Sequence, residues 1–190
     1  MRFRHVILDR DGVLNVEVAD HGYVTVPAEW CWIPGALEAL SMLQHAGVRV
    51  SVATNQSGVG RGLMTAAALE AVHARMLEDA ERAGARIARI YTCPHAPDDR
   101  CQCRKPAPGL IRQAIAESGI GPDETLVVGD DLRDLTAART AGVRAALVLT
   151  GKGRSVTAPL PEVETPVYDD LRTLALHLLA EGHIQGDSSK

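Results

Sequence analysis

Short apolar runs rich in β-branched residues alternate along the chain with longer segments in which apolar residues recur at helical spacing. This alternation predicts strands joined by crossover helices, an α/β fold with a doubly wound, Rossmann-like parallel sheet. We expect strands at residues 5–9, 48–54, 87–92, 125–129 and 144–149. We expect helices at residues 35–46, 65–83, 109–118 and 132–141, and a last element at residues 168–180.

The predicted helix at residues 65–83 shows how the apolar spacing assigns faces. Val72, His73 and Met76 fall on one stripe, which we expect to face the sheet. Thr65 precedes the stripe as an N-cap, and Gly84 stands where a helix ends. Because His73 lies on the apolar stripe, we interpret it as a packing residue rather than a ligand.

Composition limits the class of protein and its partners. With 190 residues, 46% of them hydrophobic, the chain is long enough to bury one core. We expect a single domain over residues 1–182 and a frayed polar tail over residues 183–190. The net charge of -4 gives no basic surplus for a nucleic-acid partner. No apolar run is long enough to span a bilayer, and the first strand begins too early to follow a signal peptide, so we expect a cytoplasmic protein without a membrane partner. We also expect a monomer.

Two carboxylates follow the first predicted strand. Asp9 and Asp11 stand one residue apart at its end, and Gly12 permits a tight backbone turn after them. Such a pair can divide two tasks, because one carboxylate can attack a phosphorus atom while the other moves the proton of the leaving group. An isolated pair with this spacing is also typical of a solvated turn. The buried apolar strand before the pair favours the chemical interpretation.

Polar residues also follow the other predicted strands. Thr54 and the glycine-rich run after it offer a hydroxyl, an amide and backbone N–H groups that suit a phosphate. Lys105, before a predicted helix, can neutralise charge on a phosphoryl group during its transfer. Asp130 follows the fourth strand and suits Mg²⁺, whereas we expect Asp134 to cap or support the next helix. Because parallel strands end at one edge of the sheet, we expect these residues to meet there.

Three of the four cysteines lie close together in the sequence. Cys93, Cys101 and Cys103 fall within eleven residues, together with His95. In a reducing compartment, three thiols and an imidazole predict a closed structural zinc site rather than disulfides. Because two cations follow Cys103 directly, we expect this site to fix their positions. Cys31 stands apart between two tryptophans, and we expect it to be buried as an apolar residue.

The strand-end motifs, in this order, look like those of the haloacid dehalogenase superfamily over residues 5–149. The resemblance implies a Mg²⁺-dependent phosphatase that forms an aspartyl-phosphate. Asp9 would be the nucleophile and a Mg²⁺ ligand, and Asp11 would be the general acid and base, with its backbone carbonyl on the metal. Thr54 and Lys105 would hold the phosphoryl oxygens, and Asp130 would complete the Mg²⁺ site. The segments between the motifs leave no room for a cap domain, so we expect a capless fold with an open site and a zinc-binding loop.

Within the superfamily, the motifs and the Cys/His loop are similar to phosphatases of D-glycero-D-manno-heptose 1,7-bisphosphate. Members of this group remove the 7-phosphate on the route to nucleotide-activated heptose for lipopolysaccharide or surface glycans. The resemblance implies that the substrate is a small sugar bisphosphate. The substrate contacts that it implies are Asp20, His21, Gly22, Tyr23, Thr54, Asn55, Gln56, Ser57, Arg104, Lys105 and Asp131.

Two other functions stay open on the sequence. Histidinol-phosphate phosphatases carry a similar Cys/His loop, although the run from Gln56 to Gly58 and the Arg61-Gly62 pair fit the heptose group better. A non-enzymatic phospho-acceptor or a zinc-stabilised binding module could share the sheet and its acidic edge. Such proteins do not need a nucleophile, an acid, a cation and a metal ligand together, which favours the enzyme. The sequence does not fix the anomer of the heptose.

Overall fold

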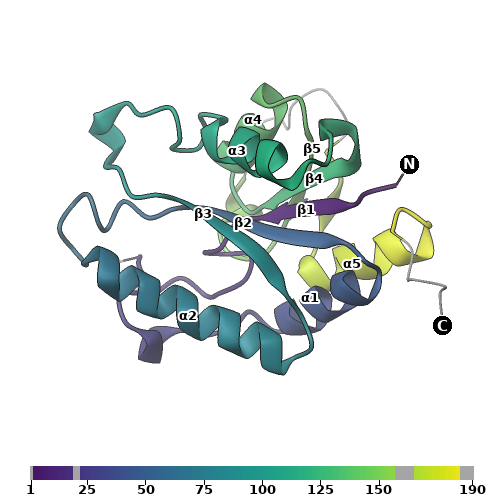
Figure 1. Ribbon diagram of the computed structural model, residues 1–190, viewed down its shortest axis with the longest axis horizontal. Helices are drawn as coiled ribbons and strands as arrows, with labels where there is room; N and C mark the ends of the chain where they lie inside the picture. The colour runs from purple at the N-terminus through teal and green to yellow at the C-terminus, as the bar shows by residue number, and fades with distance from the viewer. Residues whose placement is uncertain (1, 19–21, 157–164, 185–190) are drawn as a thin grey trace.

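The computed structural model describes residues 2–18, 22–156 and 165–184, and its centre is a six-stranded parallel sheet (Figure 1). The strand order is β3-β2-β1-β4-β5-β6, so the direction of winding reverses between β1 and β4. This reversal opens a crevice at the carboxyl ends of β1 and β4. The strands are β1 His5–Leu8, β2 Arg49–Asn55, β3 Ile87–Cys93, β4 Thr125–Gly129, β5 Arg144–Val148 and β6 Val167–Tyr168.

Helices cover both faces of the sheet (Figure 1). Helices α1 (Ala36–His45), α2 (Ala66–Arg82) and α5 (Leu171–Ala180) pack on one face, and α3 (Gly109–Ser118) and α4 (Leu132–Thr140) pack on the other. Short 3₁₀ helices occupy Pro27–Glu29, Pro97–Asp99, Pro122–Glu124 and Gly153–Ser155. Among the described residues, no helix combines the length and the apolar character that crossing a membrane requires.

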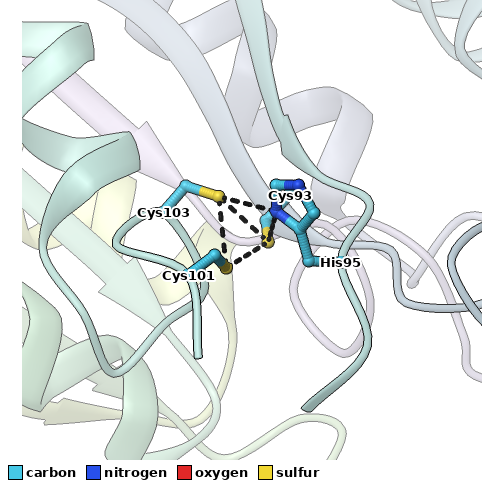
Figure 2. A group of neighbouring side chains, drawn as sticks. All are labelled: Cys93, His95, Cys101 and Cys103. Atoms are coloured by element: carbon cyan, nitrogen blue, oxygen red, sulfur yellow. Dashed lines mark hydrogen bonds between the residues drawn. The ribbon is translucent and has the colours of Figure 1, made fainter. Parts of the chain in front are cut away.

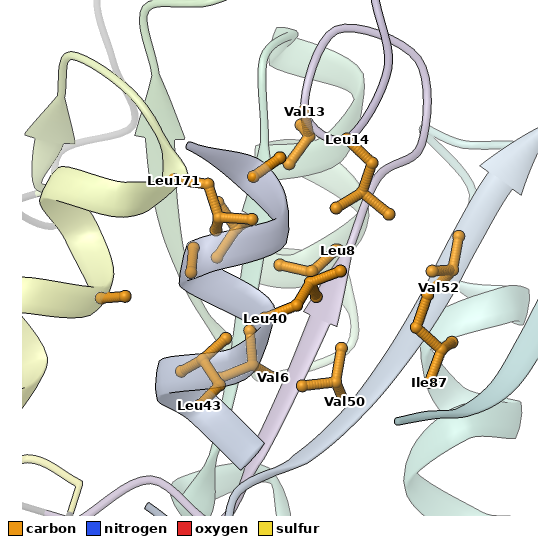
Figure 3. Packing of buried hydrophobic residues seen from close by; sticks show 14 of the residues in the cluster. Val6, Leu8, Val13, Leu14, Leu40, Leu43, Val50, Val52, Ile87 and Leu171 are labelled. Carbon is orange, nitrogen blue, oxygen red and sulfur yellow. The ribbon is translucent and has the colours of Figure 1, made fainter. Parts of the chain in front are cut away.

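The alternation along β1 divides the core between the two faces. Val6 and Leu8 belong to the cluster under α1, α2 and α5, whereas Ile7 belongs to the cluster under α3 and α4. Figure 3 shows Leu40 and Leu43 of α1 beside Val6 and Leu8. Because β1 is buried on both faces, the loop that follows it is anchored in the core.

The structure confirms the predicted strands and helices, with small shifts at their ends. Thr65 caps α2 as expected, since its hydroxyl accepts a hydrogen bond from the Ala68 N–H at 3.1 Å. The element predicted at residues 168–180 is wrong in extent: it divides into β6 and α5. Asp170 causes the division, because its carboxylate accepts the Thr173 N–H at 2.7 Å and starts α5 there.

Two further predictions about burial need correction. Cys31 is exposed, because extended backbone turns it outward while Trp30 next to it is buried. The first two residues of the predicted frayed tail are packed, since Ile184 is buried in the core and the His183 carbonyl accepts the Phe3 N–H at 2.7 Å. The rest of the predicted tail, residues 185–190, lies outside the described residues.

Candidate active site

A cavity of about 350 Å³ lies at the carboxyl ends of the strands and gathers most of the predicted chemical residues. Asp9 and Asp11 enter from the loop after β1, Thr54 from β2, and Asp130 from the loop after β4. The sequence therefore predicted correctly where these side chains meet. The full lining is Asp9, Asp11, Glu17, Gly22, Tyr23, Thr54, Asn55, Ser57, Arg61, Arg104, Lys105, Asp130, Arg133, Asp134 and Lys152.

Lys105 is a buried cation shared between two carboxylates. Its Nζ lies 2.8 Å from Asp9 Oδ1 and 2.6 Å from Asp134 Oδ1, and it also donates to the Ala53 carbonyl at 2.8 Å. Burial by itself would lower the pKa of Lys105, but the carboxylates of Asp134 and Asp9 raise it above its ordinary value. The residue therefore stays an ammonium. Asn55 holds its backbone, donating to the Lys105 carbonyl and accepting the Lys105 N–H, each at 3.0 Å.

The acidic residues of the cavity fit a divalent cation. Asp9, Asp130 and Asp134 each bring a carboxylate oxygen within 4.8 Å of the others. Burial raises the pKa of Asp9 to about 7, and the neighbouring carboxylates add to this rise against the opposing effect of Lys105. Burial also raises the pKa of Asp130 to about 6. In the metal-free protein, ionisation of these buried carboxylates is unfavourable. A bound Mg²⁺ would stabilise their ionised form, because it prefers hard, anionic oxygen ligands.

Two glycines let the backbone close around Asp130. Gly12 has φ 86° and Gly151 has φ 54°, and a Cβ atom at either position would collide with the Asp130 carboxylate. The loop after β5 fixes the same carboxylate, because the Lys152 N–H donates to Asp130 Oδ2 at 2.8 Å. The Thr150 hydroxyl ties this loop to the first motif by donating to the Gly12 carbonyl at 2.6 Å. Small residues thus set the geometry of the acidic cluster.

Asp11 is held from three sides. The Arg10 Nη2 lies 2.9 and 3.1 Å from its two oxygens, and the Asn15 amide donates to Oδ1 at 2.9 Å. The Gln56 amide donates to Oδ2 at 2.6 Å and to the Thr54 hydroxyl at 2.9 Å. Burial would raise the pKa of Asp11, but Arg10 and the two amides lower it. Gln56, predicted to contact the substrate, has a fully buried side chain that donates to Asp11.

One part of the cavity lining carries a hydroxyl pair beside an arginine. Tyr23 Oη and Ser57 Oγ lie 2.8 Å apart, and the Arg61 guanidinium donates to Tyr23 Oη at 3.4 Å. Tyr23 and Ser57 were both predicted to contact the substrate, and both line the cavity. The neighbouring predictions at Asp20 and His21 lie outside the described residues.

Asp131 begins helix α4 instead of lining the cavity. Its carboxylate accepts the Arg133 N–H at 3.0 Å and pairs with the Arg133 guanidinium at 2.8 Å. Asp134 completes the cap by accepting the Asp131 N–H at 3.2 Å. The predicted substrate contact of Asp131 therefore finds no support in this geometry, whereas Arg133 does line the cavity. The prediction for Asp134 was incomplete, because its other oxygen holds Lys105.

Cys93, His95, Cys101 and Cys103 point toward one centre (Figure 2). The three sulfur atoms lie 3.3–3.6 Å apart, and His95 Nδ1 lies 3.2 Å from Cys103 Sγ. A tetrahedral zinc ion with Zn–S bonds of about 2.3 Å separates its sulfur ligands by about 3.8 Å, so the cluster is compatible with zinc. The Arg104 guanidinium donates to the His95 carbonyl at 3.5 Å, which links the cluster to the cavity.

Four charged residues of the cavity were not assigned to the site from the sequence. Glu17, Arg61, Arg133 and Lys152 line it, and the Lys152 ammonium lies 2.6 Å from Glu17 Oε1, joining two walls. A signal for Lys152 was present, because a lysine between two glycines follows the fifth strand at the same sheet edge. Arg61 had a signal only as part of the Arg61-Gly62 pair that resembles the heptose group. Glu17 and Arg133 have none, since single charged residues in loops and helices are commonly solvated.

Comparison with known proteins gives the family. A family model described as HAD-hydrolase-like matches residues 102–174. The D-glycero-beta-D-manno-heptose-1,7-bisphosphate 7-phosphatase of Pseudomonas aeruginosa is 46% identical over 92% of this chain and 97% of that protein. The protein of the same name from Neisseria meningitidis serogroup B is 42% identical over 93% of this chain and 95% of that protein.

A solved structure agrees with these relatives. The crystal structure of D,D-heptose 1,7-bisphosphate phosphatase from B. bronchiseptica, complexed with magnesium and phosphate, superposes with a TM-score of 0.88 at 43% identity. It covers 95% of this chain, which in turn covers 99% of that one. The fold, the motifs and these identities lead to one conclusion: the chain belongs to the heptose-1,7-bisphosphate 7-phosphatase family of haloacid dehalogenase-like hydrolases.

Proposed function

We propose that this chain is a Mg²⁺-dependent phosphatase that removes the 7-phosphate from D-glycero-β-D-manno-heptose 1,7-bisphosphate. The observation that carries the proposal is the contact of the Lys105 ammonium with Asp9, 2.8 Å apart, in a cavity that Asp11 also lines. This arrangement supplies a nucleophile, an acid and a cation around one site. The named substrate of relatives with 46% and 42% identity supports the heptose and its β anomer.

In the first chemical step, a carboxylate oxygen of Asp9 attacks the phosphorus of the 7-phosphate. The bond between phosphorus and the sugar oxygen breaks. Asp11 enters this step in its protonated form, although its neighbours lower its pKa, and its proton passes to that oxygen. Lys105 and Thr54 hold the phosphoryl oxygens, and the ammonium offsets their charge. The products of this step are the aspartyl-phosphate at Asp9 and the sugar monophosphate.

In the second step, Asp11 acts as a base. It takes a proton from a water molecule whose oxygen attacks the phosphorus of the aspartyl-phosphate, and the Asp9 carboxylate leaves. The clamp of Arg10, Asn15 and Gln56 around Asp11 stabilises its ionised form, which suits this half of the reaction. Phosphate is released, and Asp9 and the protonated Asp11 are regenerated for the next cycle.

Asp9 and Asp130, with the backbone carbonyl of Asp11, would hold Mg²⁺. When bound, Mg²⁺ supplies positive charge that neutralises phosphoryl oxygens and keeps Asp9 ionised. Gly12 and the Lys152 N–H keep Asp130 in place for this purpose. The burial of both carboxylates and their raised pKa values support the assignment.

We infer that the part of the cavity lined by Arg61 and Arg104 receives the 1-phosphate of the substrate. Arg61 and Arg104 line the cavity beside Tyr23 and Ser57, where a second phosphate can accept hydrogen bonds from both guanidinium groups and both hydroxyls. A substrate with one phosphate leaves these donors unused. The geometry therefore favours a sugar bisphosphate over a monophosphate.

The Cys/His cluster is proposed as a structural zinc site. Three thiols and one imidazole would fill the four positions that a structural zinc ion offers and would leave none for a substrate. Through Arg104 and Lys105, which follow Cys103 in the chain, bound zinc would keep the cations of the cavity in place. We further propose that residues 1–184 act as one catalytic domain, that the chain is a monomer, and that it works in the cytoplasm on nucleotide-heptose biosynthesis.

The test is initial phosphate release in the presence of Mg²⁺ from both anomers of heptose 1,7-bisphosphate and from histidinol phosphate. We expect the largest kcat/KM for the β anomer. A larger value for histidinol phosphate would replace the proposed substrate and keep the catalytic roles. Asp9→Asn and Asp11→Asn should each abolish turnover without unfolding the protein. Full activity in Asp9→Asn would overturn the mechanism.

A further inference from the structure

Arg10, between the two catalytic carboxylates, points away from the cavity into the protein. Its side chain is completely buried, whereas the side chains of Asp9 and Asp11 on either side remain 15% exposed to the cavity. A buried guanidinium carries a large desolvation penalty unless its donors are used. All of its nitrogens do find partners, and three of these contacts end on Asp11.

The other side of the Arg10 guanidinium contacts two residues from distant parts of the chain. The Arg10 Nη1 lies 3.2 Å from Nε2 of His73, which projects from α2. The guanidinium carbon lies 5.8 Å from the ring centroid of Trp30, which is buried. Burial and the charge of Arg10 lower the pKa of His73 to about 4, so its imidazole is neutral at neutral pH and Nε2 can accept the Arg10 proton.

These contacts form a continuous chain from α2 to the edge of the cavity. His73 accepts from Arg10 at one end, and at the other end Arg10 donates to Asp11, from Nε to Oδ1 at 3.3 Å and from Nη2 to Oδ2 at 3.1 Å. Two parallel hydrogen bonds from a planar guanidinium fix both the position and the plane of a carboxylate. Proton transfer requires this orientation, because a misplacement of about 1 Å can slow a reaction by about a hundredfold.

We propose that His73 and Arg10 are positioning residues for the proton-transfer group of this enzyme. His73 lies outside the cavity and acts on the reaction through Arg10, which aims Asp11 at the oxygen of the leaving group. The inference rests on the proposed role of Asp11 as general acid. The proposal gives His73 a function, whereas its position on the apolar stripe of the helix predicted only a packing role.

A matched pair of variants separates positioning from packing. His73→Leu fills the site but leaves the Arg10 Nη1 without its acceptor, whereas His73→Gln offers an amide oxygen near the place of Nε2. We expect His73→Leu to lower kcat on heptose 1,7-bisphosphate by about tenfold or more, with KM nearly unchanged, and His73→Gln to recover most of this loss. Arg10→Lys, which keeps the charge and loses the planar fork, should show the same signature.

The leaving group gives a readout that a purely structural role would not change. Nitrophenyl phosphate releases a stable anion that needs little protonation, so its kcat should fall far less than that of the sugar in His73→Leu. Equal losses on both substrates, or no loss on the sugar, would overturn the proposal. A crystal structure of His73→Leu adds a second criterion, since an unchanged Arg10–Asp11 fork would also overturn it.

The experiment remains decisive if the substrate assignment is wrong. If the wild-type protein does not hydrolyse heptose 1,7-bisphosphate, histidinol phosphate provides the alkyl leaving group for the same comparison. Failure of the proposed function would then appear as a change of substrate in the wild-type protein. If the positioning proposal is wrong, the variants will show no difference between their loss of kcat on alkyl phosphates and their loss of kcat on aryl phosphates.

Discussion

The ammonium of Lys105 lies 2.6 Å from Oδ1 of Asp134, closer than the 2.8 Å that separates it from Asp9, the proposed nucleophile. Asp134 therefore competes with Asp9 for one buried positive charge. In the proposed mechanism, this competition leaves part of the negative charge of Asp9 uncompensated for the attack on phosphorus. Asp134 is thus connected to the chemistry through Lys105, although it also closes the cap of α4.

We expect Asp134→Asn to lower kcat by about tenfold or more, because Lys105 would then neutralise Asp9 more completely. Loss of a charged hydrogen bond in the interior should also reduce the free energy of unfolding by about 1.5–3 kcal/mol. Phosphate release and urea unfolding measure the two effects. The control is Glu78→Gln, which removes an exposed ion pair with Arg82 and should change stability by less than about 1 kcal/mol. An Asp134→Asn variant with normal kcat would limit Asp134 to helix capping.

Stabilisation by Mg²⁺ should depend on pH. The pKa values of Asp9 and Asp130 are raised to about 7 and about 6 in the folded, metal-free protein, above the ordinary value of 3.8. Folding therefore favours their protonated forms, and the metal-free protein loses stability as the pH rises from about 4 to about 7. Mg²⁺ binds the ionised forms, so it should raise the Tm more at about pH 8 than at about pH 5.

Thermal unfolding with EDTA or with excess MgCl₂ at both pH values provides the measurement. Asp130→Asn serves as the control, because it removes one carboxylate of the pair and should reduce the Mg²⁺-induced rise in Tm at the higher pH. An equal rise at both pH values in the wild-type protein would show that these carboxylates are not the ones that bind the metal.

Much of the site could be predicted because its residues follow buried strands. Asp9, Thr54 and Asp130 each stand at the end of an apolar run, and parallel strands carry such positions to one edge. The direction of a side chain in a loop is not encoded in the same way. Gln56 was expected to face the substrate, yet it turns inward, where Asp11 needs a donor. Its direction depends on the loop after β1, which is distant in sequence.

Residues that act through tertiary contacts were the hardest to predict. Asp134 and His73 both lie on regular helices, where capping and packing explain their presence equally well. Their functional partners, Lys105 and Arg10, belong to other elements and become visible only when the sheet brings them together. Cys31 shows the opposite case, because its apolar neighbours suggested burial while the alternation of extended backbone exposed it.

We expect Gly12→Ala to impair catalysis by displacing Asp130. The added Cβ atom would collide with the Asp130 carboxylate, and φ 86° is strained for alanine. The control is Gly47→Ala, which has a similar φ of 69° but no atom within 4 Å of the added Cβ. Both variants should lose about 1 kcal/mol or more of stability, while only Gly12→Ala should weaken Mg²⁺ activation. Titration of phosphate release with Mg²⁺ distinguishes them, and equal activation in both would contradict the steric argument.

The cysteines offer an internal control for the zinc proposal. Cys103→Ser removes a ligand beside Arg104 and Lys105, whereas Cys31→Ser changes an exposed thiol remote from the cluster in sequence. We expect Cys103→Ser to lose bound zinc, to unfold at a lower temperature and to lower kcat/KM, because the cations after the loop are no longer held. Cys31→Ser should keep all three properties. Elemental analysis, thermal unfolding and phosphate release test this, and a Cys103→Ser protein with full zinc content would place the metal elsewhere. Full activity after loss of zinc would instead separate the metal from the positioning of Lys105.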